Sequence, residues 1–334
     1  MIQNLQAYDA VELAVLERSG FVESIHTGSA VVVAADGSVV TELGNINAPI
    51  YPRSAAKPFQ ALAAMQAGVP LRGAQVAIAC GSHTGSLDHM DMVSGMLKAA
   101  GLEEKHLGCP PAWPSDASAR AWMVRTGREK SKLAMSCSGK HAAFLWACTE
   151  NGWDVSGYLE PNHPMQRAVR SVLEECTQET VAHTGVDGCG APVMAVSLTG
   201  LARAFSTLAQ APSNKHANAR AATIATSMLD YPWAVEGHGK PNTVVMDELG
   251  ILAKMGAEGV LLLATSTGAG AAVKILDGNG RAATLVGLTL LAASGAVDVP
   301  PVAELLNKLV PPVMGGNSAA GSLRLGQAVS ALLN

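Results

Sequence analysis

The chain has 334 residues, and its 23 Lys+Arg against 27 Asp+Glu side chains give a formal net charge of -4, which excludes nucleic-acid-binding proteins that rely on clustered positive charge. Charged residues are 15% of the sequence and hydrophobic residues 49%, a balance that excludes intrinsic disorder. Apolar runs such as 259–265 and 284–293 are much shorter than the run of about 20 residues that a membrane-spanning helix requires.

The first part of the chain has the pattern of strands followed by a helix. In residues 21–45, β-branched runs are separated by the turn-forming pairs Thr27-Gly28 and Asp36-Gly37, which predicts strands joined by hairpins. Residues 53–68 are rich in Ala, Leu, Met and Gln, which predicts a helix of about three turns. The apolar run 74–79 that follows is predicted to be a strand.

The middle of the chain, from about residue 71 to 220, is predicted to be mostly helical. Short helical stretches alternate there with loops rich in Gly, Pro, Ser and Cys. The predicted helices cover 88–100, 141–150, 164–175 and 191–208. In the third part, residues 259–293 predict two apolar strands joined at a glycine-rich turn and followed by an apolar helix.

Strands at both chain ends with helices between them favour a mixed α/β (α+β) fold rather than a doubly wound sheet, because strands and crossover helices do not alternate regularly. We predict one domain over residues 1–334, with an antiparallel sheet drawn from both chain ends, flanking helices and a mostly helical insertion in the middle. Its sheet-bearing sub-lobe is expected at roughly 1–70 plus 240–334, and its helical sub-lobe, which contains the candidate metal loops, at 71–239.

Ser54 and Lys57 form the first candidate for chemistry. A Ser-x-x-Lys spacing puts the amine one helical turn from the hydroxyl, so that a neutral lysine can accept the serine proton. The start of the helix adds partial positive charge that stabilises a developing alkoxide. The alternative is a purely structural one, in which Ser54 caps the helix and Lys57 is solvated.

The second candidate is Ser82, in the loop Cys80–Ser86. Small hydroxyl residues between glycines, directly after an apolar run, let the backbone approach a ligand closely. The alternative is an ordinary turn in which Ser82 or Ser86 caps the next helix.

A third candidate joins the loop Ser136–His141 to the loop Asp187–Pro192. Thiolates and a deprotonated amine are donors that zinc accepts, and both loops carry cysteine beside glycine. Neither loop has a standard zinc spacing, so buried free thiols remain the alternative. The six cysteines as a group favour a reducing compartment, and with no signal-peptide pattern the expected location is cytoplasmic.

Read together, these segments resemble the bacterial asparaginase II family, the rhizobial type of L-asparaginase. Seven ordered motifs between about residues 18 and 290 carry the resemblance. They are Phe21–His26, Pro52–Gln60, Ala79–His83, Cys137–His141, Asp187–Pro192, Met255–Val260 and Val273–Gly278.

The resemblance implies a hydrolase, specifically an amidohydrolase that converts L-asparagine to L-aspartate and ammonia, on a fold similar to serine β-lactamases, penicillin-binding proteins and glutaminases. It implies two serine-lysine pairs, Ser54 with Lys57 and Ser82 with Lys274. The zinc ligands that it implies are Cys137, Lys140 and Cys189. Substrate recognition is expected from Arg53, His141 and Asp187.

A glutaminase or another small-amide or β-lactam-type serine hydrolase is the alternative within enzymes, because one methylene of substrate changes discrimination by only about 1–3 kcal/mol. The alternative outside enzymes is a zinc-binding or amino-acid-binding protein without turnover. The small proportion of charged residues favours a homodimer, and neither nucleic acid nor a membrane is an expected partner.

Overall fold

The computed structural model describes residues 4–333 and divides the chain into two compact units. The first unit contains the N-terminal residues through Ala55, the segment Ala195–Gln210, and the chain from Glu248 onward. The second contains Ala56–Met194 and Ala211–Asp247. Compared with the sub-lobes expected from the sequence, the first helix lies in the second unit and the helix of Ala195–Gln210 lies in the first.

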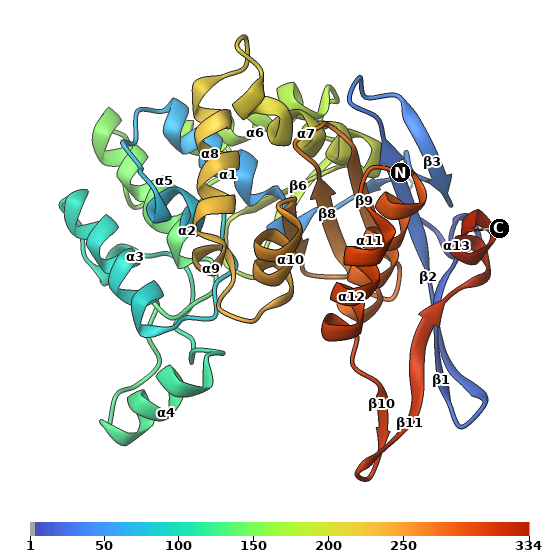
Figure 1. Cartoon of the computed structure of the whole chain (residues 1–334). Coiled ribbons are helices and arrows are strands. Elements are labelled where there is room, and N and C mark those ends of the chain that lie inside the picture. The colour runs from blue at the N-terminus through green and yellow to red at the C-terminus, as the bar shows by residue number, and fades with distance from the viewer. Residues whose placement is uncertain (1–3, 334) are drawn as a thin grey trace. The chain divides into compact units, whose positions relative to one another are not determined.

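The first unit is built on an antiparallel sheet whose strands come from both chain ends (Figure 1). Its strand order is β10-β11-β1-β2-β9-β8-β7, with β3 paired to β2 off this path. The strands are β1 (Val11–Arg18), β2 (Phe21–Val33), β3 (Val39–Leu43), β7 (Leu252–Gly256), β8 (Val260–Ala264), β9 (Gly270–Ile275), β10 (Val313–Gly315) and β11 (Ser318–Leu325). The predicted mixed class, with an antiparallel sheet assembled from both ends of the chain, is confirmed.

Helices cover both faces of the central strands. Alternate residues of a strand point to opposite faces: a Cβ at Gly270 would meet Ala202 and Ser206 of α7 (Leu198–Gln210), whereas Val273 lies against Gly287 of α11 (Ala283–Ala293). Helix α12 (Val299–Leu309) packs against α11, and both are drawn in front of β8 in Figure 1. A layer of strands between apolar helices is thus the core of this unit.

The second unit is mostly helical. Its central helices α1 (Lys57–Gln66) and α5 (Ser138–Asn151) contact each other, and α5 is buried at every residue from Ser138 to Cys148. A helix buried over most of its length belongs in a core. The unit also contains α2 (Ala74–Ala79), α3 (Leu87–Ala99), α4 (Ala117–Arg125), α6 (Pro164–Thr177), α8 (Ala219–Asp230) and α9 (Pro232–Val235).

The remaining elements are short, and three of them, among them the 3-10 helix Arg53–Ala56, run across the boundary between the units along the chain. Strand β6 (Pro192–Ser197) and helix α10 (Pro241–Leu249) each begin in the second unit and end in the first. The others are β4 (Pro49–Ile50), β5 (His183–Val186), α13 (Gln327–Ser330) and the 3-10 helices Ala7–Asp9, Glu104–His106, Ala211–Ser213, Gly280–Ala282 and Ala331–Leu333. Among the described residues, no helix is long and apolar enough to cross a bilayer.

Three sequence-based element predictions are wrong. The run Ala74–Ala79 is helix α2 and not a strand, and the predicted helix 191–208 begins as strand β6 before α7. Thr27-Gly28 is not a turn, because β2 continues through it. Gly28 is required there for another reason: a Cβ would collide with the backbone oxygen of Lys274 on the adjacent strand β9.

Candidate functional site

Ser54 lies in the first unit, in the 3-10 turn Arg53–Ala56, and the chain passes into the second unit directly after Ala55. Arg53 has a left-handed φ of 52°, which is uncommon for a residue other than glycine and marks a constrained backbone beside Ser54. The Arg53 guanidinium lies 3.8 Å from Glu258 Oε1. The candidate nucleophile and the candidate carboxylate-binding arginine are therefore neighbours in one turn.

Lys254, which the sequence analysis missed, lies on the strand that borders this turn. A Cβ at Gly256 would lie 3.1 Å from the Ala55 nitrogen and closer still to the Pro52 oxygen, so β7 touches the backbone around Ser54. Because side chains two residues apart share a strand face, Lys254 is on the face of β7 that meets this turn. It is fully buried, and its Nζ donates to the Met255 carbonyl at 2.7 Å.

Lys274, the lysine that the resemblance assigns to Ser82, occupies a different position in the first unit. Its Nζ donates to the carbonyls of Glu258 at 2.6 Å and Ile275 at 2.7 Å. Burial lowers the pKa of Lys274, while the carboxylates of Glu258 and Asp277 oppose that shift. Ser82 belongs to the second unit, so the pairing of Ser82 with Lys274 stays a prediction.

In the second unit, Lys57 is held against the loop that contains Ser82. Its Nζ donates to Ser82 Oγ at 3.0 Å, to the Gly81 carbonyl and, at 3.4 Å, to the Ser136 carbonyl. Lys57 is the first residue of α1 and is only 1% exposed. These acceptors come from two different segments of the chain, so this side chain has one defined position.

Gly81 and Ser86 explain the shape of this loop. A Cβ at Gly81 would lie 2.9–3.0 Å from the carbonyl oxygens of Ala234, Val235 and Ile78, so only glycine fits. Ser86 caps α3 by accepting from the His89 N–H. The capping role that the sequence left open between the two serines therefore belongs to Ser86, and Ser82 faces Lys57.

Cys137, Lys140 and Cys189, the predicted metal ligands, are brought together in the second unit. Lys140 Nζ lies 3.2 Å from Cys189 Sγ, and all three side chains are buried. A hydrogen bond from Cys189 holds the pKa of Cys137 well below its ordinary value, and Lys57 and Lys140 lower it further against the opposing effect of burial. The same hydrogen bond and burial raise the pKa of Cys189.

Burial disfavours the charge on Lys140, but Cys189, Cys137 and Asp187 outweigh it and raise the pKa of Lys140. Two cysteine sulfurs and one buried lysine nitrogen thus converge from two segments of the chain. This donor set fits a borderline-soft ion such as zinc, because thiolate and amine donors suit it and the protons on these donors can be displaced on binding. In the part of the chain that the structure describes, no group of three His, Cys, Asp or Glu could hold a metal; the third donor here is a lysine.

His141 and Asp187, predicted to recognise substrate, lie next to these donors in the sequence: His141 directly follows Lys140, and Asp187 lies two residues before Cys189. His141 is fully buried, and its Nδ1 lies 2.7 Å from the Tyr158 hydroxyl, which accepts from the Gly108 N–H. Burial lowers the pKa of His141 well below 6.5, and Lys140 and Lys57 add to the shift.

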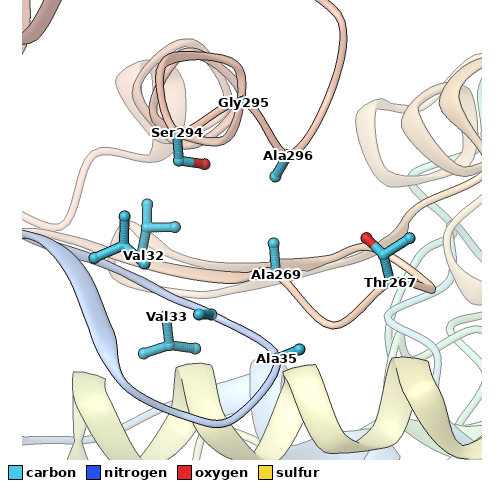
Figure 2. A pocket seen from close by; sticks show the side chains of 10 residues that line it. Val32, Val33, Ala35, Thr267, Ala269, Ser294, Gly295 and Ala296 are labelled. Carbon is cyan, nitrogen blue, oxygen red and sulfur yellow. The ribbon is translucent and has the colours of Figure 1, made fainter.

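Apart from these clusters, a hollow of about 230 Å³ lies in the first unit, between the end of β2 and the turn after α11 (Figure 2). Its lining contains Val32, Thr267, Ala269 and Ser294 and no ionisable side chain. The hollow lacks a base, a nucleophilic pair and metal donors, so it is not a candidate for the chemistry predicted from the sequence.

Comparisons with solved structures find distant likenesses. The chain is similar to a crystal structure of Mglu in its glutamate form, with 14% identity and a TM-score of 0.45 over 79% of this chain and 60% of that one. It is also similar to a Bacillus glutaminase, with 13% identity and a TM-score of 0.36 over 81% of this chain and 92% of that one. A Bacteroides dorei protein named as a candidate β-lactamase matches with 13% identity and a TM-score of 0.41 over 78% of this chain and 91% of that one. At these TM-scores the likenesses carry no argument about function.

Sequence comparison is more decisive. The chain spans about 60% of the length of the Mglu structure, and no curated protein matches its sequence. The model of the L-asparaginase II family matches residues 14–325, nearly the whole chain and both of its units. The resemblance predicted from seven motifs is therefore confirmed: the chain belongs to the L-asparaginase II family, a family of amidohydrolases.

Proposed function

We propose that the protein is an L-asparaginase, which hydrolyses the side-chain amide of L-asparagine to L-aspartate and ammonia. Membership of the L-asparaginase II family supports amide hydrolysis. The observation that carries the proposal is the buried Lys57 Nζ at 3.0 Å from Ser82 Oγ, with Cys137 beside it. A lysine and a serine in hydrogen-bond contact are the parts that proton transfer in acyl chemistry requires.

Ser54 is the proposed nucleophile. Its hydroxyl oxygen adds to the amide carbon while neutral Lys57 takes the proton; the C–N bond then breaks as nitrogen is protonated, releasing ammonia and leaving a β-aspartyl ester. Water adds to this ester, the bond to Ser54 Oγ breaks, and aspartate leaves. The hydrogen bonds of Lys57 Nζ to the Gly81 and Ser136 carbonyls support this role, since they hold the amine in one place beside the loop of Ser82.

The second proton carrier is proposed to be Ser82, which would pass the proton from Lys57 to the leaving nitrogen. The resemblance assigns Lys274 as its partner. Lys254 is a further candidate for the second lysine, because it is completely buried on the strand that touches the turn of Ser54. Lys274 is engaged by two carbonyls of its own unit and is partly exposed.

Zinc is proposed to be held by Cys137, Lys140 and Cys189, and when bound it would supply positive charge that orients the substrate. Arg53 is the proposed partner of the substrate α-carboxylate, and His141 and Asp187 are proposed to bind other polar groups of the substrate. A homodimer in the cytoplasm remains the proposed state of the protein.

The test is ammonia release from L-asparagine, L-glutamine and a β-lactam panel by the wild type and by Ser54→Ala and Ser82→Ala. We expect turnover of asparagine by the wild type and a loss of 100-fold or more in both variants. Ser86→Ala is the matched control, because this serine of the same loop caps a helix, so its loss costs about 1 kcal/mol of stability and little activity. Preference for glutamine would make the protein a glutaminase, and ligand binding without turnover would make it a binding protein.

A further inference from the structure

Both ring nitrogens of His83 are engaged by defined partners. The Gly85 N–H donates to Nδ1 at 3.1 Å, so Nδ1 carries no proton. Nε2 lies 2.9 Å from Ser138 Oγ. The Ser138 hydroxyl uses its one proton toward the Leu133 carbonyl at 2.8 Å, so His83 must be the donor in the bond between them. The two contacts of the ring and the one of Ser138 therefore specify a single tautomer.

This bond joins two loops that carry site residues. His83 directly follows Ser82, and Ser138 directly follows Cys137. A second bond runs beside it, from the His83 backbone N–H to the Ser136 carbonyl at 3.2 Å. Lys57 Nζ donates hydrogen bonds to both loops, to Ser82 Oγ in one and to the Ser136 carbonyl in the other. The position of Lys57 thus depends on how the two loops are held together.

The surroundings of His83 keep its ring in place and uncharged. The side chain is 1% exposed and stacks on His89, with ring centroids 4.9 Å apart and an interplanar angle of 20°. His89 is itself fixed, since its Nε2 lies 2.9 Å from the Trp233 carbonyl. Burial lowers the pKa of His83 well below 6.5, and His89 and Lys57 add to that effect. A buried, stacked ring with both nitrogens satisfied has little freedom to move.

We propose that His83 is a positioning residue, whose Nε2–H bond to Ser138 fixes the segment Ser136–Lys140, where a loop ends and α5 begins, relative to Ser82 and so holds Lys57 in the geometry for proton transfer. The inference rests on the proposed amide hydrolysis for its effect on rate, and on the structure alone for its effect on the loop. The proposed role of His83 involves no contact with the substrate. Its loss should lower kcat while leaving KM nearly unchanged, because substrate contacts remain.

Two substitutions of His83 separate its two bonds. In His83→Gln the amide nitrogen replaces Nε2 and keeps the donor to Ser138, whereas in His83→Asn the amide oxygen replaces Nδ1 and keeps only the acceptor for Gly85. We expect kcat for asparagine to fall about 100-fold in His83→Asn and less than fivefold in His83→Gln, with KM within threefold in both. Equal losses in the two variants, or a loss confined to KM, would overturn the proposal.

Ser138→Ala removes the same bond from the other side and guards against a folding defect particular to residue 83. If one bond is responsible, the double variant His83→Asn/Ser138→Ala should lose no more than the worse single variant; multiplied losses would refute a shared role. His163→Asn is the matched control. This buried histidine of the same unit accepts from the Met165 N–H through Nδ1, and the amide oxygen of asparagine can replace that acceptor. The kcat of His163→Asn should therefore stay at the wild-type level.

A measurement that needs no activity completes the test. Hydrogen–deuterium exchange of the peptide 131–140 should accelerate tenfold or more in His83→Asn and in Ser138→Ala, and should be unchanged in His83→Gln and in His163→Asn. If the wild type releases no ammonia from any amide, the proposed function fails, and the exchange pattern still decides whether His83 fixes this loop. Equal exchange in His83→Asn and the wild type would overturn the positioning role.

Discussion

Replacing Gly139 by alanine is expected to destabilise the second unit, although alanine is the better helix former. Gly139 lies in the first turn of α5, against the end of α2. A Cβ there would lie 2.9 Å from the Ile78 carbonyl carbon and closer still to its oxygen, whereas ordinary contact begins at 3.4 Å. The two helices must therefore separate by at least 0.5 Å or so. That movement also disturbs the turn into Ser82, because the Gly81 N–H donates to the Ile78 oxygen at 3.0 Å.

The magnitude follows from two opposing terms. Overpacking of a well-packed site costs about 1–3 kcal/mol, and a clash with backbone belongs at the upper end of that range. The helix propensity of alanine returns about 1 kcal/mol. The net loss is about 2 kcal/mol, or a fall in Tm of about 4–8 °C for a cooperative unit of 150–250 residues.

Gly95→Ala is the matched control for this prediction. Gly95 lies inside α3, where a Cβ would meet nothing within 4 Å, so its substitution should stabilise the protein by about 0.5–1 kcal/mol. Urea unfolding of both variants and the wild type measures the two changes. A Gly139→Ala variant as stable as Gly95→Ala would refute the close approach of α2 and α5.

Three further predictions concern the candidate site. Lys254→Met should lower kcat for asparagine about 100-fold or more and Lys274→Met less than tenfold; the reverse order in steady-state kinetics would favour the predicted pair of Ser82 and Lys274. Zinc content by elemental analysis should fall from about one ion per chain to near zero in Cys137→Ala. It should be retained in Cys148→Ala, because burial raises the pKa of the Cys148 thiol to about 12. Zinc bound equally by both variants would remove Cys137 from the ligands. Between pH 6.5 and 5 stability should fall, because three buried histidines of the second unit have folded-state pKa values below 6.5 and only the unfolded chain takes up their protons, each worth up to about 1.4 kcal/mol per pH unit. Urea midpoints between pH 8 and 5 measure this, and a flat profile would contradict it. These histidines are His83, His89 and His141.

The sequence predicted the elements whose periodicity is long and clear. The hairpin of β8 and β9 and the apolar helix α11 follow from apolar runs bounded by glycine-rich turns. The run Ala74–Ala79 was too short to show a period, and its mixture of alanine and β-branched residues fits a strand and a buried helix equally. Pro192–Ser197 lies next to a good helix former, α7, so propensity alone merged the strand into the helix.

The site was predictable in its motifs but not in all its partners. The loops of Cys137 and Cys189 do converge on Lys140, as the resemblance implied. Lys254 was missed because it looks like any lysine at the end of an apolar run, and only the contact between Gly256 and the turn of Ser54 reveals its place. The hydrogen bond between His83 and Ser138 joins residues 55 positions apart, and no local sequence pattern predicts it.

The central claim is that Lys57 carries protons in the hydrolysis of asparagine. Its most direct test is ammonia and aspartate formation from L-asparagine by the purified wild type and by Lys57→Met, with folding of both checked by thermal unfolding. We predict that the wild type forms the two products in equal amounts and that Lys57→Met, still folded, is slower by 1000-fold or so. A folded Lys57→Met variant with wild-type turnover, or a wild type that leaves asparagine unchanged, would contradict the account.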